Sequence, residues 1–405
     1  MRAIVLSNIP HYHHLAEALY EAGFLERYIT SPALLAGEQA PAWWPEKLQR
    51  KLEGRRLNGV PKTSVRQVRW PEILQRLLPI AGVMSRERAN WLNNQLFDRR
   101  SLRLIEDCDV FHFVSSVGLN CAQKAKAAGA TIVCDVRQEH PAFQRRILNE
   151  ESALFGMEAK ITGFTYESKV LEEFALADYI VVPSIHARRT FLEQGFAPEK
   201  LLLLPYGVDV QRFRNEGKSD NTFRIIYAGS LTIRKGAQYL LEAFSQMRHQ
   251  NAELVLVGPL DPDFRKVLSR FEGSFRYLGV VPKITLKELY SNSSVFVLPS
   301  LADSYSLATL EAMACGLPVI VSQNTGAADV LEHGKEGFVV PIRDARAIRD
   351  YLELLRRNED LRREMGARAE VRAREMTWAR YGGEAVRYYR EMEFKRSRQI
   401  DAILT

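Results

Sequence analysis

One segment shows the architecture of this chain most clearly: Phe223-Arg224-Ile225-Ile226-Tyr227-Ala228-Gly229-Ser230-Leu231-Thr232-Ile233-Arg234-Lys235-Gly236. Its first six residues form an apolar run of strand length, a short polar turn follows, and apolar residues then recur at helical spacing. Downstream, strand patterns recur at 253–257, 275–278, 295–298 and 318–321, and helical patterns at 236–249, 262–271, 285–292 and 307–315. Strands that alternate with helices predict a doubly wound α/β unit with a parallel sheet.

The N-terminal half repeats this alternation. Strand patterns occur at 1–7, 110–114, 131–134 and 179–183, and helical patterns at 15–23, 120–128 and 167–177. A polar, irregular stretch at 208–219 separates the halves, and a helical pattern at 380–392 is expected to pack back onto the first unit. We therefore predict an N-terminal domain of residues 1–210 joined by 379–405, and a C-terminal domain of residues 211–378. Ligands of open parallel sheets bind at the carboxyl ends of the strands, here in a cleft between the domains.

Composition excludes several classes of protein. The chain has 405 residues, 46% of them apolar, 26% charged, and a net charge of +7, which fits two globular domains rather than disorder or a collagen-like repeat. No apolar run approaches the roughly 18 residues that a membrane-spanning helix needs. With no signal-peptide pattern at the start, a cytoplasmic protein is expected. The four cysteines are spread out and predict free thiols.

The turn after the strand 223–228 is a candidate phosphate site. A helix N-terminus offers unpaired N–H groups and a partial positive charge, and Arg234 and Lys235 add two full charges. A basic turn that is simply solvated is the alternative interpretation.

A second candidate lies in the segment 299–319. Asp303 follows a strand, and Glu311 lies in the next helix on an apolar face with Leu307. A carboxylate in such surroundings needs a partner, and a ribose diol would supply two hydroxyl donors. The plainer interpretation is a helix cap at Asp303 or Ser304 and a structural Glu311.

Several phrases, in order, resemble the retaining nucleotide-sugar glycosyltransferases of family four. They are Ala177-Asp178-Tyr179-Ile180-Val181-Val182-Pro183-Ser184, Leu204-Pro205-Tyr206-Gly207-Val208-Asp209 with Arg212-Phe213, the turn Gly229 to Gly236, Leu278-Gly279-Val280-Val281, the block Pro299 to Val319, and Gly326, Asp329, Glu332, Gly334 and Gly337. The resemblance implies the GT-B fold, in which two Rossmann-like domains face each other across a cleft. It also implies a nucleotide-diphosphate sugar as donor, bound mainly by the C-terminal domain.

The resemblance also implies residue roles. The two acids of the family's Glu-x7-Glu motif correspond to Asp303, near the donor sugar, and Glu311, on the ribose; the first acid is one methylene shorter here. Of the family's Arg and Lys on the diphosphate, Lys235 is present, Ser230 stands in the Arg position, and Arg234 is the nearest substitute. Val280 and Val281 are expected to hold the base through their backbone. The donor-binding candidates are Gly229, Ser230, Lys235, Val280, Val281, Ser304, Tyr305, Ser306, Leu307 and Glu311, and the catalytic candidates are Lys235, Asp303, Arg234 and His140.

Loops of the N-terminal half carry the candidates for the acceptor or the transferred sugar. His11, His13 and His14 follow the first strand, Ser115 follows the strand 110–114, and Asp135, Arg137 and His140 follow the strand 131–134. Solvent exposure of the histidines and a structural ion pair of Arg137 are the alternatives. A metal site at the histidines is not expected, because no carboxylate or cysteine accompanies them at ligand spacing.

The implied reaction retains the anomeric configuration and requires no metal or other cofactor. Asp107-Cys108-Asp109 has the spacing of a metal-binding Asp-x-Asp motif, but it precedes a strand and is interpreted as a solvated strand entry. Two other hypotheses are a catalytically impaired GT-B protein that binds only nucleotide or a partner, motivated by Asp303 and Ser230, and a phosphorylase or epimerase.

The positive charge is concentrated in one stretch. Residues 41–100 contain 13 Lys or Arg and 5 Asp or Glu, so they carry 13 − 5 = +8. Trp43, Trp44, Trp70 and the run 73–80 lie among these charges, a composition suited to anionic lipid headgroups or an anionic acceptor. A solvated basic face is the alternative, and nucleic-acid binding is not expected because no recognition motif is present. The donor type, UDP or GDP, and the acceptor, a polysaccharide, a lipid-linked glycan or a small metabolite, are left open by the sequence.

Overall fold

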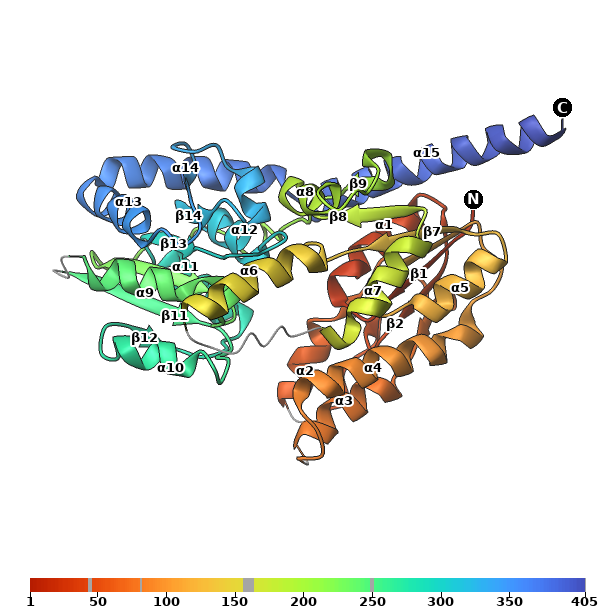
Figure 1. Cartoon of the computed structure of the whole chain (residues 1–405), viewed down its shortest axis with the longest axis horizontal. Helices are drawn as coiled ribbons and strands as arrows, with labels where there is room; N and C mark the ends of the chain where they lie inside the picture. The colour runs from red at the N-terminus through yellow and green to blue at the C-terminus, as the bar shows by residue number, and fades with distance from the viewer. Residues whose placement is uncertain (43–45, 81, 156–163, 248–250, 405) are drawn as a thin grey trace.

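The structure is a computed structural model that describes residues 1–42, 46–80, 82–155, 164–247 and 251–404. The chain forms two α/β units, each built on a parallel sheet, and they lie side by side in Figure 1. The first sheet uses strands up to residue 203 and the second uses strands from residue 223. The two Rossmann-like domains predicted from the alternation of strands and helices are therefore confirmed.

The first sheet has seven strands in the order β5-β2-β1-β6-β7-β8-β9, all of them parallel. β1 and β6 lie at its centre, and every residue of both is buried, as expected for strands covered on both faces. The strands are β1 Ala3–Ser7, β2 Leu25–Thr30, β5 Val65–Gln67, β6 Val110–Val114, β7 Thr131–Asp135, β8 Tyr179–Val182 and β9 Leu201–Leu203; β3 Leu34–Leu35 and β4 Arg56–Leu57 pair separately. The helices are α1 His13–Glu21, α2 Glu46–Glu53, α3 Trp70–Ile80, α4 Arg86–Ser101, α5 Leu119–Ala127, α6 Pro141–Leu154, α7 Phe164–Leu176 and α8 Ile185–Leu192.

The second sheet has six parallel strands in the order β12-β11-β10-β13-β14-β15. Its strands are β10 Phe223–Ala228, β11 Ala252–Val257, β12 Arg276–Tyr277, β13 Val295–Leu298, β14 Val319–Ser322 and β15 Gly337–Val340. Its helices are α9 Ala237–Ser245, α10 Arg265–Leu268, α11 Lys283–Ser291, α12 Leu307–Ala314, α13 Ala345–Arg357 and α14 Glu359–Glu375. The helix predicted at 262–271 is shorter because Asp261 holds a turn, its carboxylate accepting from Asp263 N at 2.9 Å.

The two sheets share a switch in strand order. β1 lies between β2 and β6, and β10 lies between β11 and β13, so consecutive strands are added first on one side and then on the other. At such a point the loops that leave the carboxyl ends of the two central strands diverge and expose a binding site. The candidate loops follow β1 and β6 in one domain and β10 and β13 in the other.

The chain crosses between the domains twice, and the two crossings touch. Val208 N donates to Met376 O at 2.8 Å, and Val208 bridges Thr377. A Cβ atom on Gly207 would lie 2.3 Å from Trp378 N, so only glycine allows this approach.

After the second crossing, α15 Trp378–Leu404 returns to the N-terminal domain and runs along α1 (Figure 1). The amino group of Met1 contacts the Glu393 carboxylate at 2.8 Å, and Tyr388 donates to Leu203 O at 2.9 Å. The helix predicted over 380–392, and its packing on the first unit, are present.

Helix α6 follows a strand of the N-terminal sheet but lies against the C-terminal domain, beside α9 in Figure 1. Glu151 is fully buried there and accepts hydrogen bonds from Gln238 at 2.9 Å, Tyr239 at 2.6 Å and Arg343 at 2.7 Å. A buried carboxylate needs this many donors, and here the second domain supplies all three.

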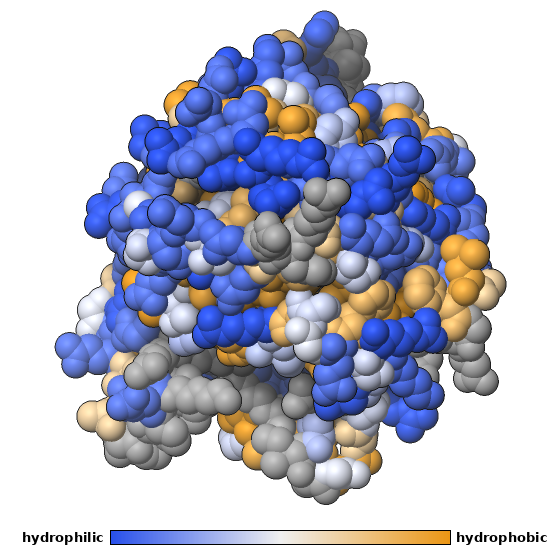
Figure 2. All heavy atoms as spheres, turned by 90° about the vertical axis from the view of Figure 1, so that its left-hand side faces the viewer, coloured by the Kyte–Doolittle hydropathy of each residue, from blue (hydrophilic) through white to orange (hydrophobic). Residues whose placement is uncertain are grey.

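Figure 2 turns the left-hand end of Figure 1 toward the viewer, and hydrophilic residues cover most of that face, with smaller apolar areas between them. Among the described helices, none has the length and apolar character required to cross a membrane. The four cysteines are buried free thiols, as predicted.

Candidate functional site

The two central strands of the C-terminal sheet place their loops next to each other. β10 pairs with β13 through Ile225–Val295 and Ile226–Phe296, and both strands end at the same edge. Leu301 N, after β13, donates to Arg234 O, after β10, at 2.8 Å. The loops are therefore joined by backbone where the sequence placed its two strongest candidates.

Lys235 and Asp303 form an ion pair across these loops, with Lys235 Nζ 2.5 Å from Asp303 Oδ2. The two side chains are only 14% and 9% exposed. Burial lowers the pKa of the Lys235 ammonium, Asp303 opposes that shift and Arg234 adds to it. A buried cation beside a second cation is a suitable place for a phosphate group.

The loops approach closely because Gly236 has no side chain. Its φ is +70°, and a Cβ atom there would lie 1.8 Å from Pro299 O. The Arg234 guanidinium donates to Ala302 O at 2.7 Å, so it is held one residue before Asp303. Ser230 contributes its carbonyl, which accepts from Tyr227 OH at 2.8 Å, and Gly229 N donates to Val257 O at 2.9 Å.

Glu311 lies on α12 with a nearly buried side chain and an ion-pair partner that sequence reasoning missed. Lys283, the first residue of α11, contacts Glu311 Oε1 through its Nζ. Burial raises the pKa of Glu311, and Lys283 partly offsets the shift. In the loop before α11, Val280 is 74% exposed and Val281 is half-buried, so the backbone of this loop is accessible to a ligand.

The residues after Asp303 contact the N-terminal domain. Ser304 Oγ donates to Arg137 O at 2.5 Å, and Tyr305 OH donates to Tyr206 O at 2.6 Å. Ser306 has a φ of +68° and caps α12, its Oγ accepting from Thr309 N at 3.4 Å, and Leu307 is the first residue of that helix. Ser304 therefore links the loop after β13 to the loop after β7, and Tyr305 links it to the segment after β9.

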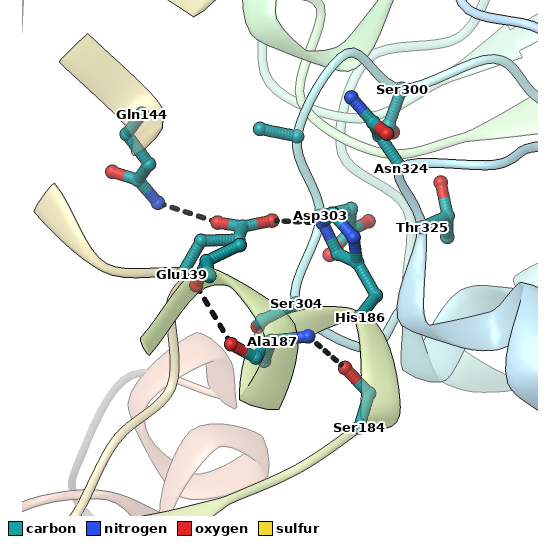
Figure 3. A network of polar contacts seen from close by, with 12 residues as sticks. Glu139, Gln144, Ser184, His186, Ala187, Ser300, Asp303, Ser304, Asn324 and Thr325 are labelled. Carbon is teal, nitrogen blue, oxygen red and sulfur yellow. Dashed lines mark hydrogen bonds and ion pairs between the residues drawn. The ribbon is translucent and has the colours of Figure 1, made fainter. Parts of the chain in front are cut away.

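Glu139 and His186 are buried at the same interface and were not singled out from the sequence (Figure 3). Glu139 accepts from Gln144 at 2.7 Å and lies 3.5 Å from His186 Nε2. Burial alone would raise the pKa of Glu139, but His186 and the charge of Arg234 lower it overall. Asp329, from the C-terminal domain, accepts from Ile185 N at 2.6 Å and His186 N at 3.2 Å. Glu139 stood in the same phrase as Arg137, but nothing in its sequence context indicated burial.

The three histidines that follow β1, His11 before α1 and His13 and His14 in its first turn, lie in different surroundings. His11 packs on Tyr206, with ring centroids 4.9 Å apart, and burial followed by the charge of Arg137 lowers its pKa to about 3. His13 is buried against Tyr28, and burial lowers its pKa to about 4. His14 stacks on Trp378 with a centroid distance of 4.4 Å.

Asp135 is almost completely buried and belongs to an internal network. Its carboxylate accepts from Tyr12 OH at 2.7 Å and lies 3.4 Å from His112 Nε2, while His112 Nδ1 lies 3.0 Å from Tyr389 OH on α15. The network ties β6 and β7 to the C-terminal helix.

Ser115 has an internal partner as well. Its hydroxyl donates to Glu173 at 3.1 Å, and Ser116 N donates to the same carboxylate at 2.6 Å. Burial raises the pKa of Glu173 to about 7 despite these donors.

His140 caps α6 and lies in an aromatic cluster. Its Nδ1 accepts from Ala142 N at 3.2 Å, and its ring lies 5.2 Å from that of Phe191 and 5.7 Å from that of Phe196. Burial lowers its pKa to about 4. No contact between His140 and the Lys235–Asp303 pair is present in the described part of the chain. The structure thus brings together Arg234, Lys235 and Asp303, whereas Asp135, Ser115 and His140 bond within the N-terminal domain.

No group of three or more His, Cys, Asp or Glu side chains in the described ranges is arranged to hold a metal ion. Asp109 accepts from Arg2 N at 2.6 Å and pairs with Arg396 at 3.1 Å, which is a structural role at the strand entry.

Comparison with known proteins shows that the segment holding this site is similar to a known family. Residues 209–372, which include Lys235, Asp303 and Glu311, match the model of the family "Glycosyl transferases group 1". The C-terminal domain is therefore similar to the group 1 glycosyl transferases over most of its length. This domain carries the ion pair and all the donor-side candidates.

Relatives extend the likeness beyond this domain. The chain is 27% identical over 261 residues to a D-inositol 3-phosphate glycosyltransferase of Pseudarthrobacter chlorophenolicus, covering 60% of this chain and 58% of that protein. It is 29% identical over 185 residues to an N-acetyl-alpha-D-glucosaminyl L-malate synthase of Bacillus anthracis, covering 44% and 47%. The alignments thus span about half the length of these relatives.

Solved structures match over nearly the whole chain. Anabaena HepE in complex with UDP-glucose has a TM-score of 0.67 at 14% identity and covers 96% of this chain and 100% of that one. Sucrose-phosphate synthase of Thermosynechococcus elongatus has a TM-score of 0.65 at 18% identity, covering 98% and 100%. The fold predicted from the resemblance, GT-B, is confirmed.

Proposed function

We propose that this protein is a retaining, metal-independent glycosyltransferase that moves a sugar from a nucleotide diphosphate to a hydroxyl group of a glycan, a lipid-linked acceptor or a small molecule. One observation carries the proposal. Lys235 and Asp303, from the two loops at the switch point, meet at 2.5 Å inside the segment that matches the group 1 transferases. The matches to transferases do not favour a protein that only binds nucleotide.

In the proposed reaction the bond between the anomeric carbon and the diphosphate oxygen breaks, and its electron pair leaves with the phosphate. Lys235 and Arg234 would stabilise this developing negative charge, which is the role that fixed cations play in transition-state stabilisation. The acceptor oxygen attacks on the same face of the sugar, and its proton passes to the departing phosphate oxygen. No protein nucleophile is required.

The other donor-side residues would orient the donor. Asp303, freed from Lys235 when the phosphate binds, would accept hydrogen bonds from hydroxyls of the sugar. Glu311 would accept from the ribose, and the backbone near Val280 and Val281 would contact the base. Each role matches the side chain's position at the edge of the sheet.

On the N-terminal side, His11 is the leading candidate for contact with a hydroxyl of the sugar or the acceptor. Its Nε2 is buried and has no hydrogen-bond partner among the described residues. With a pKa of about 3 its imidazole is neutral at physiological pH, so it can donate or accept a hydrogen bond without carrying charge. The Arg137 guanidinium, which is exposed and whose charge acts on His11, is the accompanying cation.

The first experiment is a thermal-shift screen with UDP, GDP, ADP and their sugar conjugates, because a ligand that binds only the native state raises the melting temperature. We expect one nucleotide to stand out, with its shift lost in Lys235→Ala and Glu311→Ala. Lys335→Ala is the matched control, since Lys335 pairs with Glu332 on the surface. No shift with any nucleotide, or an equal shift in the Lys235 variant, would contradict the proposal.

Turnover assays then test the stereochemistry and the metal independence of the proposed reaction. With the selected donor, NMR of the product should show the anomeric configuration of the donor, and dialysis against EDTA should leave the rate unchanged. An inverted product would support a glycosyltransferase but reject retention of the anomeric configuration. Activity restored only by a divalent cation would likewise support a glycosyltransferase but reject metal independence. Donor conversion without an acceptor would instead indicate an epimerase.

A further inference from the structure

Helix α3 exposes a continuous apolar face. Trp70 is 72% exposed, Ile73 43%, Leu74 38% and Leu77 56%. These positions follow the spacing i, i+3, i+4, i+7, which places them in one stripe along the helix. A stripe of this kind normally faces a protein core, so its exposure indicates an interaction surface. We call Trp70, Ile73, Leu74 and Leu77 the α3 face.

The opposite side of α3 is fixed to the domain, so the α3 face points outward. Glu72 is buried and pairs with Arg55 at 2.6 Å. Gln75 Nε2 donates to Asn90 Oδ1 on α4 at 2.5 Å, and α3 packs along α4. Because these contacts hold the polar side of the helix inward, the apolar side cannot be buried by a simple rotation of α3.

Exposed arginines lie at the start of α3 and along the adjacent helix α4. Arg69, immediately before Trp70, is exposed, as are Arg88, Arg99 and Arg100 on α4. The stretch 41–100 carries a charge of +8, while the whole chain carries +7, so the rest of the molecule has a net charge of about −1. A solvent-exposed apolar stripe that begins next to Arg69, in a segment with this excess of positive charge, is complementary to a membrane surface with negatively charged headgroups over apolar acyl chains.

The face also lies on the side of the sheet that carries the acceptor loops. α3 begins shortly after β5, and Val68 N, between them, still donates to Thr30 O at the end of β2. Since β5, β2 and β1 are parallel, the segment after β5 leaves the sheet at the same edge as the loop with His11. A surface bound by α3 would therefore be on the side of the N-terminal domain where its candidate loops emerge.

We propose that the α3 face docks on the surface of a membrane rich in anionic lipids. Trp70, Ile73 and Leu77 enter the boundary between headgroups and acyl chains, and the neighbouring arginines bind lipid phosphates. The interaction does not require donor turnover, so it stands or falls independently of the proposed function. If both hold, an acceptor anchored in the membrane would reach the N-terminal loops without leaving the bilayer surface.

Sedimentation with lipid vesicles tests the proposal on the full-length protein. Vesicles of phosphatidylcholine alone are compared with vesicles that contain phosphatidylglycerol. We expect binding to rise at least about tenfold with the anionic lipid and to weaken with salt, because arginines are attracted to a negatively charged surface and salt screens that attraction. Absence of binding to anionic vesicles, or equal binding to both kinds, would overturn the proposal.

Variants assign the binding to the α3 face. Ile73→Ser/Leu77→Ser should lose most of the binding, whereas Val371→Ser, an exposed apolar residue (59%) on α14, should not. Both changes are at exposed positions, and circular dichroism checks that the variants remain folded. In addition, brominated acyl chains should quench the fluorescence of the protein, and Trp70→Phe should remove most of that quenching.

Two outcomes would overturn membrane docking by the α3 face. If the double variant binds vesicles as well as the parent protein does, and quenching persists in Trp70→Phe, the arginines act elsewhere and the proposal is wrong. If the parent protein dimerises at micromolar concentration without lipid and the double variant stays monomeric, the α3 face is an interface between two copies of this chain.

Discussion

The loops at the two switch points of this molecule use polar side chains in opposite ways. In the C-terminal domain, Lys235 and Asp303 come from two loops and pair at the edge of the sheet. In the N-terminal domain, Ser115 follows β6, the counterpart of β13, but bonds inward to Glu173, and Asp135, the last residue of the neighbouring strand β7, bonds inward to Tyr12. The same strand topology in the two domains therefore does not give the polar side chains at the strand ends the same role.

The two domains differ in how their charged side chains are paired. The donor-side pair places a cation where a phosphate could replace the carboxylate, so a ligand can take over an existing interaction. The N-terminal networks, in contrast, connect buried groups that all have partners within the same domain and on α15, and removing one member leaves the others unsatisfied. The first arrangement is suited to binding and the second to holding the fold.

Lys235→Met is expected to have the largest effect. By losing the cation that faces the developing charge, the variant should lose about 100- to 1000-fold in kcat, the usual consequence of removing one transition-state donor. The assay is turnover of the donor identified by the thermal-shift screen, with Lys335→Met as the control for loss of a surface charge. If the Lys235→Met protein is folded and its kcat is unchanged, Lys235 does not take part in the reaction.

Asp135→Ala is the counterpart in the N-terminal domain, and its effect should be on stability. The change leaves Tyr12 OH and His112 Nε2 buried without their shared partner, which should cost about 2–4 kcal/mol of the free energy of unfolding. Urea unfolding measures the loss, and Asp107→Ala, at an exposed position, should change little. If the folded variant instead loses kcat by a factor like that of Lys235→Met, Asp135 belongs to the chemistry and the contrast between the domains fails.

The variant His140→Asn tests whether His140 serves as the N-cap of α6 or takes part in catalysis. The folded-state pKa of His140 is about 4, below its usual value of 6.5, so the unfolded chain binds the proton more readily between these values. His140 therefore adds stability above about pH 6.5 that is lost as the pH falls toward 4. Asn retains the cap on Ala142 N but does not titrate, so the slope of stability against pH should become shallower, by less than about 1 kcal/mol per pH unit.

Turnover at pH 7.5 gives the decisive contrast for His140. We expect His140→Asn to keep most of the activity of the parent protein, and the exposed His333→Asn to leave the activity unchanged. Loss of turnover in His140→Asn with an unaltered pH slope would restore the catalytic role that the sequence suggested.

The donor side could be predicted from the sequence because each step is local or set by topology. The strands 223–228 and 295–298 have the bounds of β10 and β13, since buried parallel strands appear as continuous apolar runs. The switch in strand order then brings the following loops together, so Lys235 and Asp303 meet although they are 68 positions apart. The sequence analysis named both residues as candidates but did not predict that they pair.

The N-terminal side could not be predicted in this way, because the fate of a polar side chain there depends on partners from remote elements. Ser115 bonds to Glu173, 58 positions away, and His112 contacts Tyr389, 277 positions away. The docking of α6 on the second domain depends on Glu151, which has the sequence context of an ordinary solvated helix residue. Burial, not residue type, decided these roles, and a single sequence does not display it.

The smallest predicted effect concerns Lys283, which pairs with Glu311 although its own side chain is 55% exposed. Burial raises the pKa of Glu311 and Lys283 lowers it, so Lys283→Ala should raise the pKa further. If the ribose donates to the ionised carboxylate, nucleotide affinity should fall about two- to fivefold near neutral pH, and the loss should deepen as the pH is lowered. Titration calorimetry with the ribonucleotide and its 2′-deoxy analogue measures this, with Lys266→Ala as an exposed control. An affinity that falls equally for both nucleotides at every pH would mean that Lys283 contacts the ligand directly and that Glu311 does not read the ribose.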